Sequence, residues 1–338
     1  MSCLAKTNSL QIEDNLKTEN KTNQMNITKE ENHIPGNNET VFQTGPQSSS
    51  DTHFRKRMRL HQSKFRAEQL KVDFGYGPTV SSKKRYGNML KTEDGNRGLN
   101  FLDPKIFEAV KKRIAIGAGA VEPFRLLNNM LSSQPLCFNL FGLMDDDTEL
   151  ATELWRKHFP ERVKRITMVE FEYTPSPKGK YLSDSTAFDV YFEYLSTKDE
   201  KGFIGIEVKL TESFSEKKYD TPIYRKWSDR EDSPWKKESR DSLPDMKHNQ
   251  LWRDHLLAES IFKQPDSGFK EYLFVLLRHP GDDECGYAVK GYKELLKDDD
   301  DTFYDFTLDR FVAGFDQMEL SEDVRKWLGL FRGRYLWV

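Results

Sequence analysis

The chain has 338 residues, of which 36% are hydrophobic and 32% are charged, and its formal net charge is −3. This balance provides no general electrostatic attraction to nucleic acid, and no run approaches the roughly 18 apolar residues that a membrane-spanning helix needs. The N-terminus also lacks the apolar core of a secretion signal, so we expect a cytoplasmic protein with no membrane partner.

Cysteine and histidine usage argues against a disulfide framework and against zinc. The three cysteines, Cys3, Cys137 and Cys285, are far apart and odd in number. The seven histidines form neither an HExxH nor an HxH pattern. A metal held by carboxylates therefore stays open. Cys137 lies in an apolar run, and we expect it to be a small core residue.

The first hundred residues are predicted to hold a tail and a basic segment. Residues 1–50 are polar and short of large apolar side chains, which predicts a disordered tail. Residues 51–100 are predicted to form a basic helix, over 52–70, and then a loop or arm, over 72–100. Residues 51–90 carry ten Lys and Arg against three Asp and Glu, a net charge of +7. Two interpretations stay open, a basic arm that tracks phosphates and a solvated helix face.

Residues 101–338 are predicted to form one domain with a mixed sheet and helices against it, an α/β fold of mixed α+β character. Helices are expected over 104–115, 147–158 and 244–263, and strands over 164–174, 186–195, 202–211 and 271–278. We expect 121–144 to be buried, 212–244 to form a polar excursion or lid, and 286–338 to pack on the same domain as short helices.

The strand over 202–211 alternates between two faces. Its apolar face consists of Ile204, Ile206, Val208 and Leu210, and its other face of Gly205, Glu207 and Lys209. The preceding strand repeats this pattern, with Phe188, Val190, Phe192 and Tyr194 on one face and Asp189, Tyr191 and Glu193 on the other. The short polar connection between the two runs predicts a hairpin, which would bring Asp189 close to Glu207.

Two carboxylates that converge on one sheet face repel each other unless a positive charge lies between them. Mg²⁺ suits such a pair, because it prefers oxygen ligands and is commonly held by one or two carboxylates with water and phosphate. The backbone carbonyl of Val208 is a further candidate ligand. Lys209 would then help to deprotonate the attacking water or stabilise charge on the phosphate. The implied reaction is hydrolysis of a phosphodiester.

The tripeptide Glu-x-Lys is unspecific by itself. It occurs at Glu19–Lys21, Glu207–Lys209 and Glu216–Lys218, and only the middle copy lies in a predicted strand with an apolar back. The structural alternative is a salt bridge on the solvated face of an antiparallel sheet.

The arrangement of Asp189 and Glu207-Val208-Lys209 on consecutive strands between two helices resembles the PD-(D/E)xK nuclease superfamily. The similarity extends over roughly 120–280, where the chain resembles a bacterial restriction-endonuclease-like branch of the superfamily. It implies a restriction-endonuclease-like core within 101–338, a central mixed β-sheet flanked by helices. The metal-binding residues of the family fall on Asp189 and Glu207, and its lysine on Lys209, although Phe188 replaces the usual proline.

The resemblance also implies partners and auxiliary residues. It implies Mg²⁺, with Mn²⁺ as an alternative, and a nucleic-acid substrate, with DNA favoured over RNA; cutting both strands would suit a homodimer. The auxiliary candidates are Glu153 on the helix before the sheet, Glu172 on the first strand, Gln250 on the helix after the lid, and Gln134. Glu153 is better explained as an exposed helix charge, and the stretch around Gln134 either caps a helix or contacts substrate.

Three hypotheses follow. The first is a DNA endonuclease, for which the resemblance suggests a role in restriction. The second is a nucleic-acid-binding module that keeps the nuclease scaffold without cutting. The third is an interaction protein with a surface salt bridge, which predicts no binding of Mg²⁺.

Overall fold

The structure is a computed structural model, and it describes residues 42–117, 121–215 and 218–336. Most of the predicted tail, 1–41, lies outside the described residues. Residues 42–50 contact the folded chain, since Gln47 Nε2 donates a hydrogen bond to Ser63 Oγ (3.2 Å) and Ser48 is buried. For 42–50 the prediction of disorder is therefore wrong.

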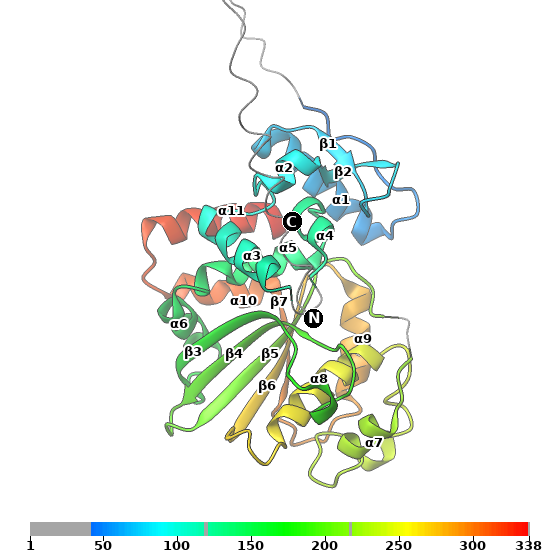
Figure 1. The fold of residues 1–338 in the computed structure, drawn as a ribbon, viewed down its shortest axis with the longest axis vertical. Helices are drawn as coiled ribbons and strands as arrows, with labels where there is room; N and C mark the ends of the chain where they lie inside the picture. The colour runs from blue at the N-terminus through cyan, green and yellow to red at the C-terminus, as the bar shows by residue number, and fades with distance from the viewer. Residues whose placement is uncertain (1–41, 118–120, 216–217, 337–338) are drawn as a thin grey trace, which may run out of the picture. The chain divides into compact units, whose positions relative to one another are not determined.

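A five-stranded mixed sheet forms the centre of the fold, in the order β3-β4-β5-β6-β7 (Figure 1). Its strands are β3 (Val163–Tyr173), β4 (Phe188–Ser196), β5 (Lys201–Lys209), β6 (Glu271–Arg278) and β7 (Phe303–Thr307). The first three pair antiparallel, and β5, β6 and β7 pair parallel. The predicted mixed sheet is confirmed, and β7 is an additional strand within the segment expected to hold only short helices.

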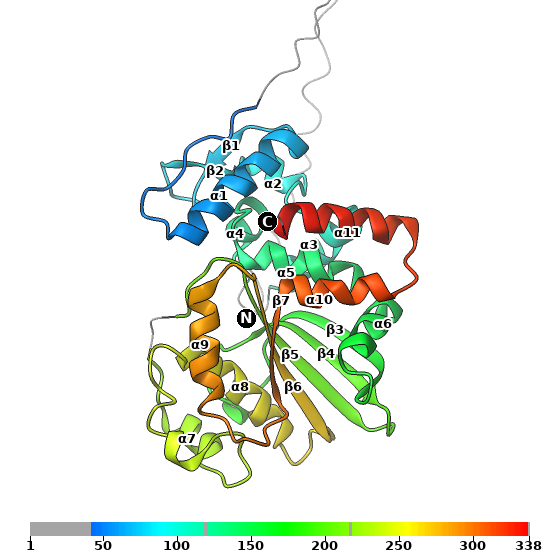
Figure 2. The same ribbon diagram turned by 180° about the vertical axis from the view of Figure 1, so that it is seen from behind.

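Helices cover both faces of the sheet (Figures 1 and 2). One layer contains α3 (Pro104–Ile116), α5 (Ser133–Phe141), α6 (Thr148–His158), α10 (Leu308–Val312) and α11 (Glu322–Tyr335). The other layer contains α7 (Pro222–Ser228), α8 (Asn249–Phe262) and α9 (Asp283–Lys293). Because both faces are covered, β5 and β6 are buried almost along their whole length.

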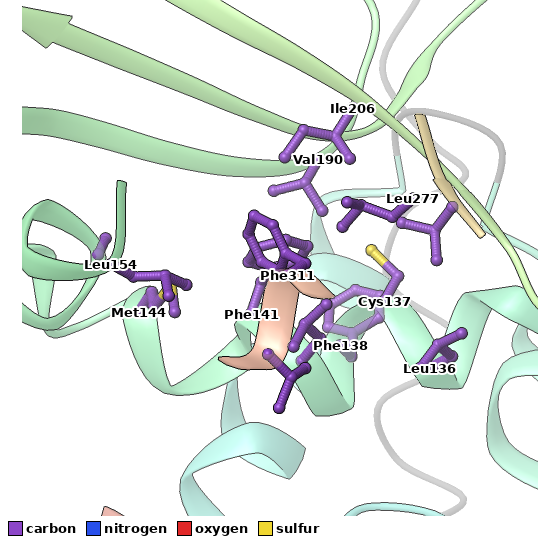
Figure 3. Close-up of a cluster of buried hydrophobic side chains, with 14 of the residues drawn as sticks. Leu136, Cys137, Phe138, Phe141, Met144, Leu154, Val190, Ile206, Leu277 and Phe311 are labelled. Carbon is purple, nitrogen blue, oxygen red and sulfur yellow. The ribbon is translucent and has the colours of Figure 1, made fainter. Parts of the chain in front are cut away.

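The core beneath the first layer is aliphatic and aromatic (Figure 3). Phe141 packs edge-on against Phe192 of β4, at 5.5 Å between ring centroids, and against Phe311, at 5.8 Å. Cys137 lies in this cluster as a buried free thiol, as predicted. The predicted burial of the segment 121–144 is confirmed for α5, all of whose residues are buried.

The segment predicted as a loop or arm has regular structure. Residues 72–100 include the antiparallel pair β1 (Phe74–Tyr76) and β2 (Arg85–Leu90), and the short helix α2 (Thr92–Asn96). The predicted basic helix is α1 (His53–Phe65), which continues as a π-helix over Arg66–Leu70. The loop prediction is therefore wrong, because the high Gly, Lys and Arg content concealed two short strands.

Helix α1 is joined to the last helix through buried polar contacts. Arg334 of α11 is fully buried and donates hydrogen bonds to Gln62 Oε1 (3.1 Å) and to the carbonyl oxygen of Asn100 (2.7 Å). Gln62 Nε2 in turn donates to the carbonyl oxygen of Arg334 (2.9 Å). The N-terminal and C-terminal helices therefore form one packed unit with the sheet.

The polar segment 212–244 is more ordered than an excursion or lid. It contains α7 and a 3₁₀ turn at Lys237–Ser239, and four of its large side chains are buried: Tyr224, Trp227, Trp235 and Leu243. The predicted helix over 244–263 begins later, at Asn249, because 242–248 forms successive turns. Short helix α4 (Pro123–Asn128) and a 3₁₀ turn at Gly142–Met144 complete the described secondary structure, with 3₁₀ turns at Lys178–Lys180 and Ala313–Gln317.

The predicted faces hold for β5 but not throughout β4. Val190, Phe192 and Tyr194 lie in the first-layer core, as expected, whereas Phe188 packs with the second layer, 6.3 Å from the ring of Phe274. A Cβ on Gly205 would lie 2.6 Å from the Phe188 ring, so the glycine makes room for it. The alternation breaks at the start of β4, so assigning Phe188 to the apolar face was wrong.

A buried carboxyl in the second layer predicts a dependence of stability on pH. Glu259 of α8 is 1% exposed, and burial raises its pKa from 4.5 to about 7, against the smaller opposing effects of Lys263 and the Tyr272 hydroxyl. The folded state binds this proton more tightly, so its contribution is full below pH 4.5 and is lost as pH rises to about 7. We expect a loss of about 3 kcal/mol over that range.

Urea denaturation of the wild type and of Glu259→Gln, at several pH values, measures this contribution. Since other titrating groups cancel in the comparison, the variant should gain stability relative to the wild type as pH rises. Parallel pH profiles for the two proteins would contradict the prediction.

In the described parts of the chain, no helix is both long and apolar enough to cross a membrane.

Candidate active site

Asp189 and Glu207 lie opposite each other where β4 begins and β5 ends. The register pairs Val190 of β4 with Ile206 of β5. One step further toward this end of the sheet, Asp189 lies opposite Glu207. The carboxylate of Asp189 accepts a hydrogen bond from the backbone N–H of Val208 through Oδ2 (2.7 Å). The backbone of Val208 therefore lies directly at the site, as the predicted use of its carbonyl requires.

Glu207, Lys209 and Gln250 form a compact hydrogen-bonded group. Lys209 Nζ lies 2.9 Å from Glu207 Oε1 and donates to Gln250 Oε1 at 3.1 Å. Gln250 Nε2 donates to Glu207 Oε1 at 2.8 Å. Gln250 reaches this pair because α8 packs across the sheet with its first turn over the end of β5. The amide thus holds both the carboxylate and the ammonium in place.

Burial rules out the surface salt bridge. Glu207 is 7% exposed and Lys209 6% exposed, so their ion pair does not lie on a solvated face. A charged pair is rarely buried unless its remaining polar groups find partners. The third hypothesis, an interaction protein with a surface salt bridge, is wrong on this point because α7 and α8 cover the face.

Glu172 joins the site through an irregularity in β3. Its backbone adopts a φ of +52°, which is uncommon for a residue other than glycine, and both Phe171 and Glu172 are buried. Gln134 Nε2 donates a hydrogen bond to Glu172 Oε1 (2.8 Å), so both auxiliary candidates lie together. Glu170, two residues earlier on β3, is half-exposed and forms an ion pair with Arg113 (3.5 Å).

The electrostatics show a site with excess negative charge. Burial raises the pKa of the Asp189 carboxyl well above its usual value, and the neighbouring Glu207 and Glu172 raise it further. The Val208 amide and Lys209 offset only part of this rise. Burial by itself would lower the pKa of the Lys209 ammonium, but Glu207 and the other carboxylates outweigh it and hold that pKa above its usual range.

The donor set fits a hard divalent cation. Three carboxylates, on Asp189, Glu172 and Glu207, repel one another beside the Lys209 ammonium, and a divalent cation between them would relieve that repulsion. Across the described residues, no three His, Cys, Asp or Glu side chains converge closely enough to hold a metal unaided. A metal here would be held by Asp189 and Glu207, with the Val208 carbonyl and oxygens of water or phosphate completing its coordination.

Glu153 does not reach the site. Its neighbour Thr152 accepts a hydrogen bond from the backbone N–H of Ile166 (2.9 Å), which fixes that part of α6 six residues before Glu172 along β3. At about 3.3 Å per residue this places Glu153 roughly 20 Å from the site. The interpretation as a helix-surface charge is therefore the better one. His255 is a structural residue of α8, buried between Tyr292 and Thr302 with 2.9 Å contacts to both hydroxyls.

Two acidic residues of the site were not predicted. Glu212 follows β5 and accepts hydrogen bonds from Arg125 (2.8 Å) and from the backbone N–H of Ser133 (2.7 Å). Burial would raise the pKa of Glu212, but Arg125, the Ser133 amide, Lys209 and the Thr211 amide together lower it below its usual value. Asp254 of α8 is 2% exposed, and burial, with Glu207 second, raises its pKa well above normal. Asp254 lies four residues after Gln250, on the same side of the helix, and this spacing is the sequence signal that could have identified it.

Ser132 caps α5 and thereby resolves one open alternative. Its hydroxyl accepts a hydrogen bond from the backbone N–H of Gln134 (3.3 Å) and another from Arg125 Nε (2.7 Å). The capping interpretation is correct for Ser132. The neighbouring Gln134 nevertheless contacts Glu172, so the same short stretch both begins a helix and supplies a residue to the site.

We expect Glu212→Gln to destabilise the fold by about 2 kcal/mol, because charge-assisted hydrogen bonds contribute about 1.5–3 kcal/mol and Glu212 is partly solvated. Urea denaturation of this variant, beside Glu319→Gln at an exposed position, measures the effect. Equal midpoints for both variants and the wild type would show that the Arg125–Glu212 pair is energetically neutral.

A family model described as the PD-(D/E)XK nuclease superfamily matches residues 49–337. Because the match covers most of the chain, the protein belongs to this superfamily, whose members are generally nucleases and typically use divalent metal ions. The resemblance seen in the sequence is confirmed. The match begins at residue 49, so it includes α1 and the β1–β2 pair. No match was found among curated proteins or among solved structures.

Proposed function

We propose that this protein is a metal-dependent DNA endonuclease whose active site contains Asp189, Glu207 and Lys209. The observation that carries the proposal is the buried group where β4 begins and β5 ends, in which Asp189 faces Glu207 and Lys209 contacts Glu207 at 2.9 Å. Burying an ion pair beside two further carboxylates costs free energy, and a protein keeps such a group where it has a function.

In this proposal each side chain has a distinct role. Asp189 and Glu207 hold Mg²⁺, with the Val208 carbonyl as a third ligand, and Mn²⁺ would fit the same oxygens. Bound there, the ion would supply Lewis-acid polarisation of the phosphodiester and of water. Lys209 donates hydrogen bonds to two acceptors, Glu207 and Gln250, so it is oriented as a donor to charge that develops on the phosphate. Glu172 adds to the negative potential that attracts the cation, and Gln134 orients Glu172.

The experiment is cleavage of supercoiled plasmid DNA by the purified full-length protein with Mg²⁺, Mn²⁺ or EDTA. We expect nicking or linearisation with either metal and none with EDTA. Calorimetric titration with Mg²⁺ should show binding in the absence of DNA. Cleavage that persists in EDTA would contradict the proposal. Single-stranded DNA and RNA, tested alongside, would define the substrate, and light scattering would test for the homodimer that double-strand cutting suggests.

The second candidate is a nucleic-acid-binding module without cleavage. It predicts DNA binding with neither Mg²⁺ binding nor nicking. Two observations favour the nuclease: Lys209 contacts Glu207, and Asp189 lies opposite Glu207 in the strand register. A site that has lost its function has no reason to retain such buried charges.

A further inference from the structure

A cleft of about 1050 Å³ opens beside the candidate active site. Its lining includes Thr211, Glu212 and Phe214, which directly follow β5, together with residues of α1, α9 and the turn before α8. Lys209 Nζ lies 5.2 Å from the centre of the Phe214 ring. The cleft therefore begins where the strand that carries Glu207 and Lys209 ends.

One wall of the cleft is basic. It consists of the first turns of α1, with His53, Arg57, and Arg55, which forms an ion pair with Asp51 (3.3 Å). The exposed Lys56 and Lys64 lie on the same helix outside the cleft lining. Two contacts fix this wall to the site. Arg55 Nη1 donates to the carbonyl oxygen of Thr211 (3.4 Å), and Phe54 packs 4.9 Å from the ring of His279, after β6.

The opposite wall is acidic and aromatic. It is formed by α9, whose first turn exposes Asp283 and Glu284, and whose Tyr287 is 76% exposed. A tyrosine this exposed, in a cleft beside a catalytic site, is available for stacking. The carboxylates would repel phosphates from this wall, so the two walls favour different parts of a nucleic acid.

The difference in charge between the two walls favours a single strand over a duplex. A duplex presents phosphates along both of its edges, and one edge would face Asp283 and Glu284. A single strand presents phosphates on one side and bases on the other. Its bases can stack on an aromatic ring, and the amino groups of cytosine and adenine can donate to carboxylates.

We propose that the cleft between α1 and α9 binds a single-stranded segment of the substrate, with its phosphates along α1 and a base stacked on Tyr287. The inference rests on the proposed function in taking nucleic acid as the ligand. It adds that the strand to be cut enters the active site unpaired, held by Arg57 and Tyr287 on opposite walls.

The test measures the fluorescence anisotropy of a short labelled DNA oligonucleotide, single-stranded or annealed, with full-length protein in EDTA to prevent cleavage. The single strand should bind more tightly. Tyr287→Ala should weaken its binding about tenfold, while Tyr287→Phe keeps the ring and the affinity. Arg57→Ala should reduce the slope of log affinity against log salt by about 0.7, as expected for one lost phosphate contact. Arg325→Ala, at an exposed position on α11, is the matched control.

Tighter binding of the duplex, or wild-type affinity for single strands in Tyr287→Ala, would overturn the inference. These outcomes differ from failure of the proposed function. A protein that nicks plasmid in Mg²⁺ but is insensitive to both cleft substitutions is a nuclease that uses another surface. A protein that never cuts, yet loses single-strand affinity in both variants, binds nucleic acid in this cleft without being a nuclease.

Discussion

Replacing Asp189 with asparagine is expected to abolish cleavage while making the metal-free protein more stable. The carboxyl of Asp189 is close to Glu207 and Glu172, and burial and both neighbours disfavour its charge. Asparagine has nearly the same shape, and its carbonyl oxygen can still accept the hydrogen bond from Val208. Removing a charge that is disfavoured in this way should raise the free energy of unfolding by about 1–3 kcal/mol at pH 8.

The two effects have separate readouts. Calorimetry should show loss of Mg²⁺ binding, the plasmid assay should show no nicking, and urea denaturation in EDTA should show a higher midpoint. Asp241→Asn, at an exposed position, is the control and should change none of the three. A destabilised Asp189→Asn variant would mean that Asp189 is held by favourable contacts rather than tolerated for its function.

Replacing Lys209 with methionine should reduce cleavage by at least about a hundredfold, the scale on which the loss of one charge-stabilising donor acts. Metal affinity should be kept or increased, because Lys209 competes with a cation for Glu207. Methionine has a similar length, so the packing beside Phe214 should persist.

Lys218→Met provides the matched control, because Lys218 belongs to another Glu-x-Lys tripeptide of this chain and is exposed. It should cleave like the wild type. If Lys209→Met retained full activity, the cleavage would come from a different site or a contaminant, and the assignment of Lys209 would fail.

The sequence predicted those parts of the site that follow from the alternation of side chains between the two faces of a strand. Glu207 and Lys209 are two residues apart in one strand, so alternation alone places them on one face. A short hairpin brings Asp189 opposite Glu207, and the observed register agrees. Gln250 was predicted only through the family resemblance. No local sequence pattern shows which face of α8 will cover β5, because α7 separates the two in the chain.

The errors have three physical origins, and the first is departure from regular alternation. The positive φ at Glu172 and the broken alternation at Phe188 reorient single side chains, and composition carries no sign of either. Glu212 was missed because its partners Arg125 and Ser133 are about eighty residues earlier. The strands β1 and β2 were missed because they are only three and six residues long.

The buried contacts of Arg334 have a consequence for long-range coupling. Helix α1, whose basic face forms one wall of the cleft, is held through Gln62 by a residue of α11 that lies 272 positions later in the sequence. Removing the Arg334 guanidinium would deprive Gln62 Oε1 and the Asn100 carbonyl of a buried hydrogen-bond donor, and α1 would lose a contact that fixes it beside the sheet. The geometry of the cleft therefore depends on a side chain that does not line it.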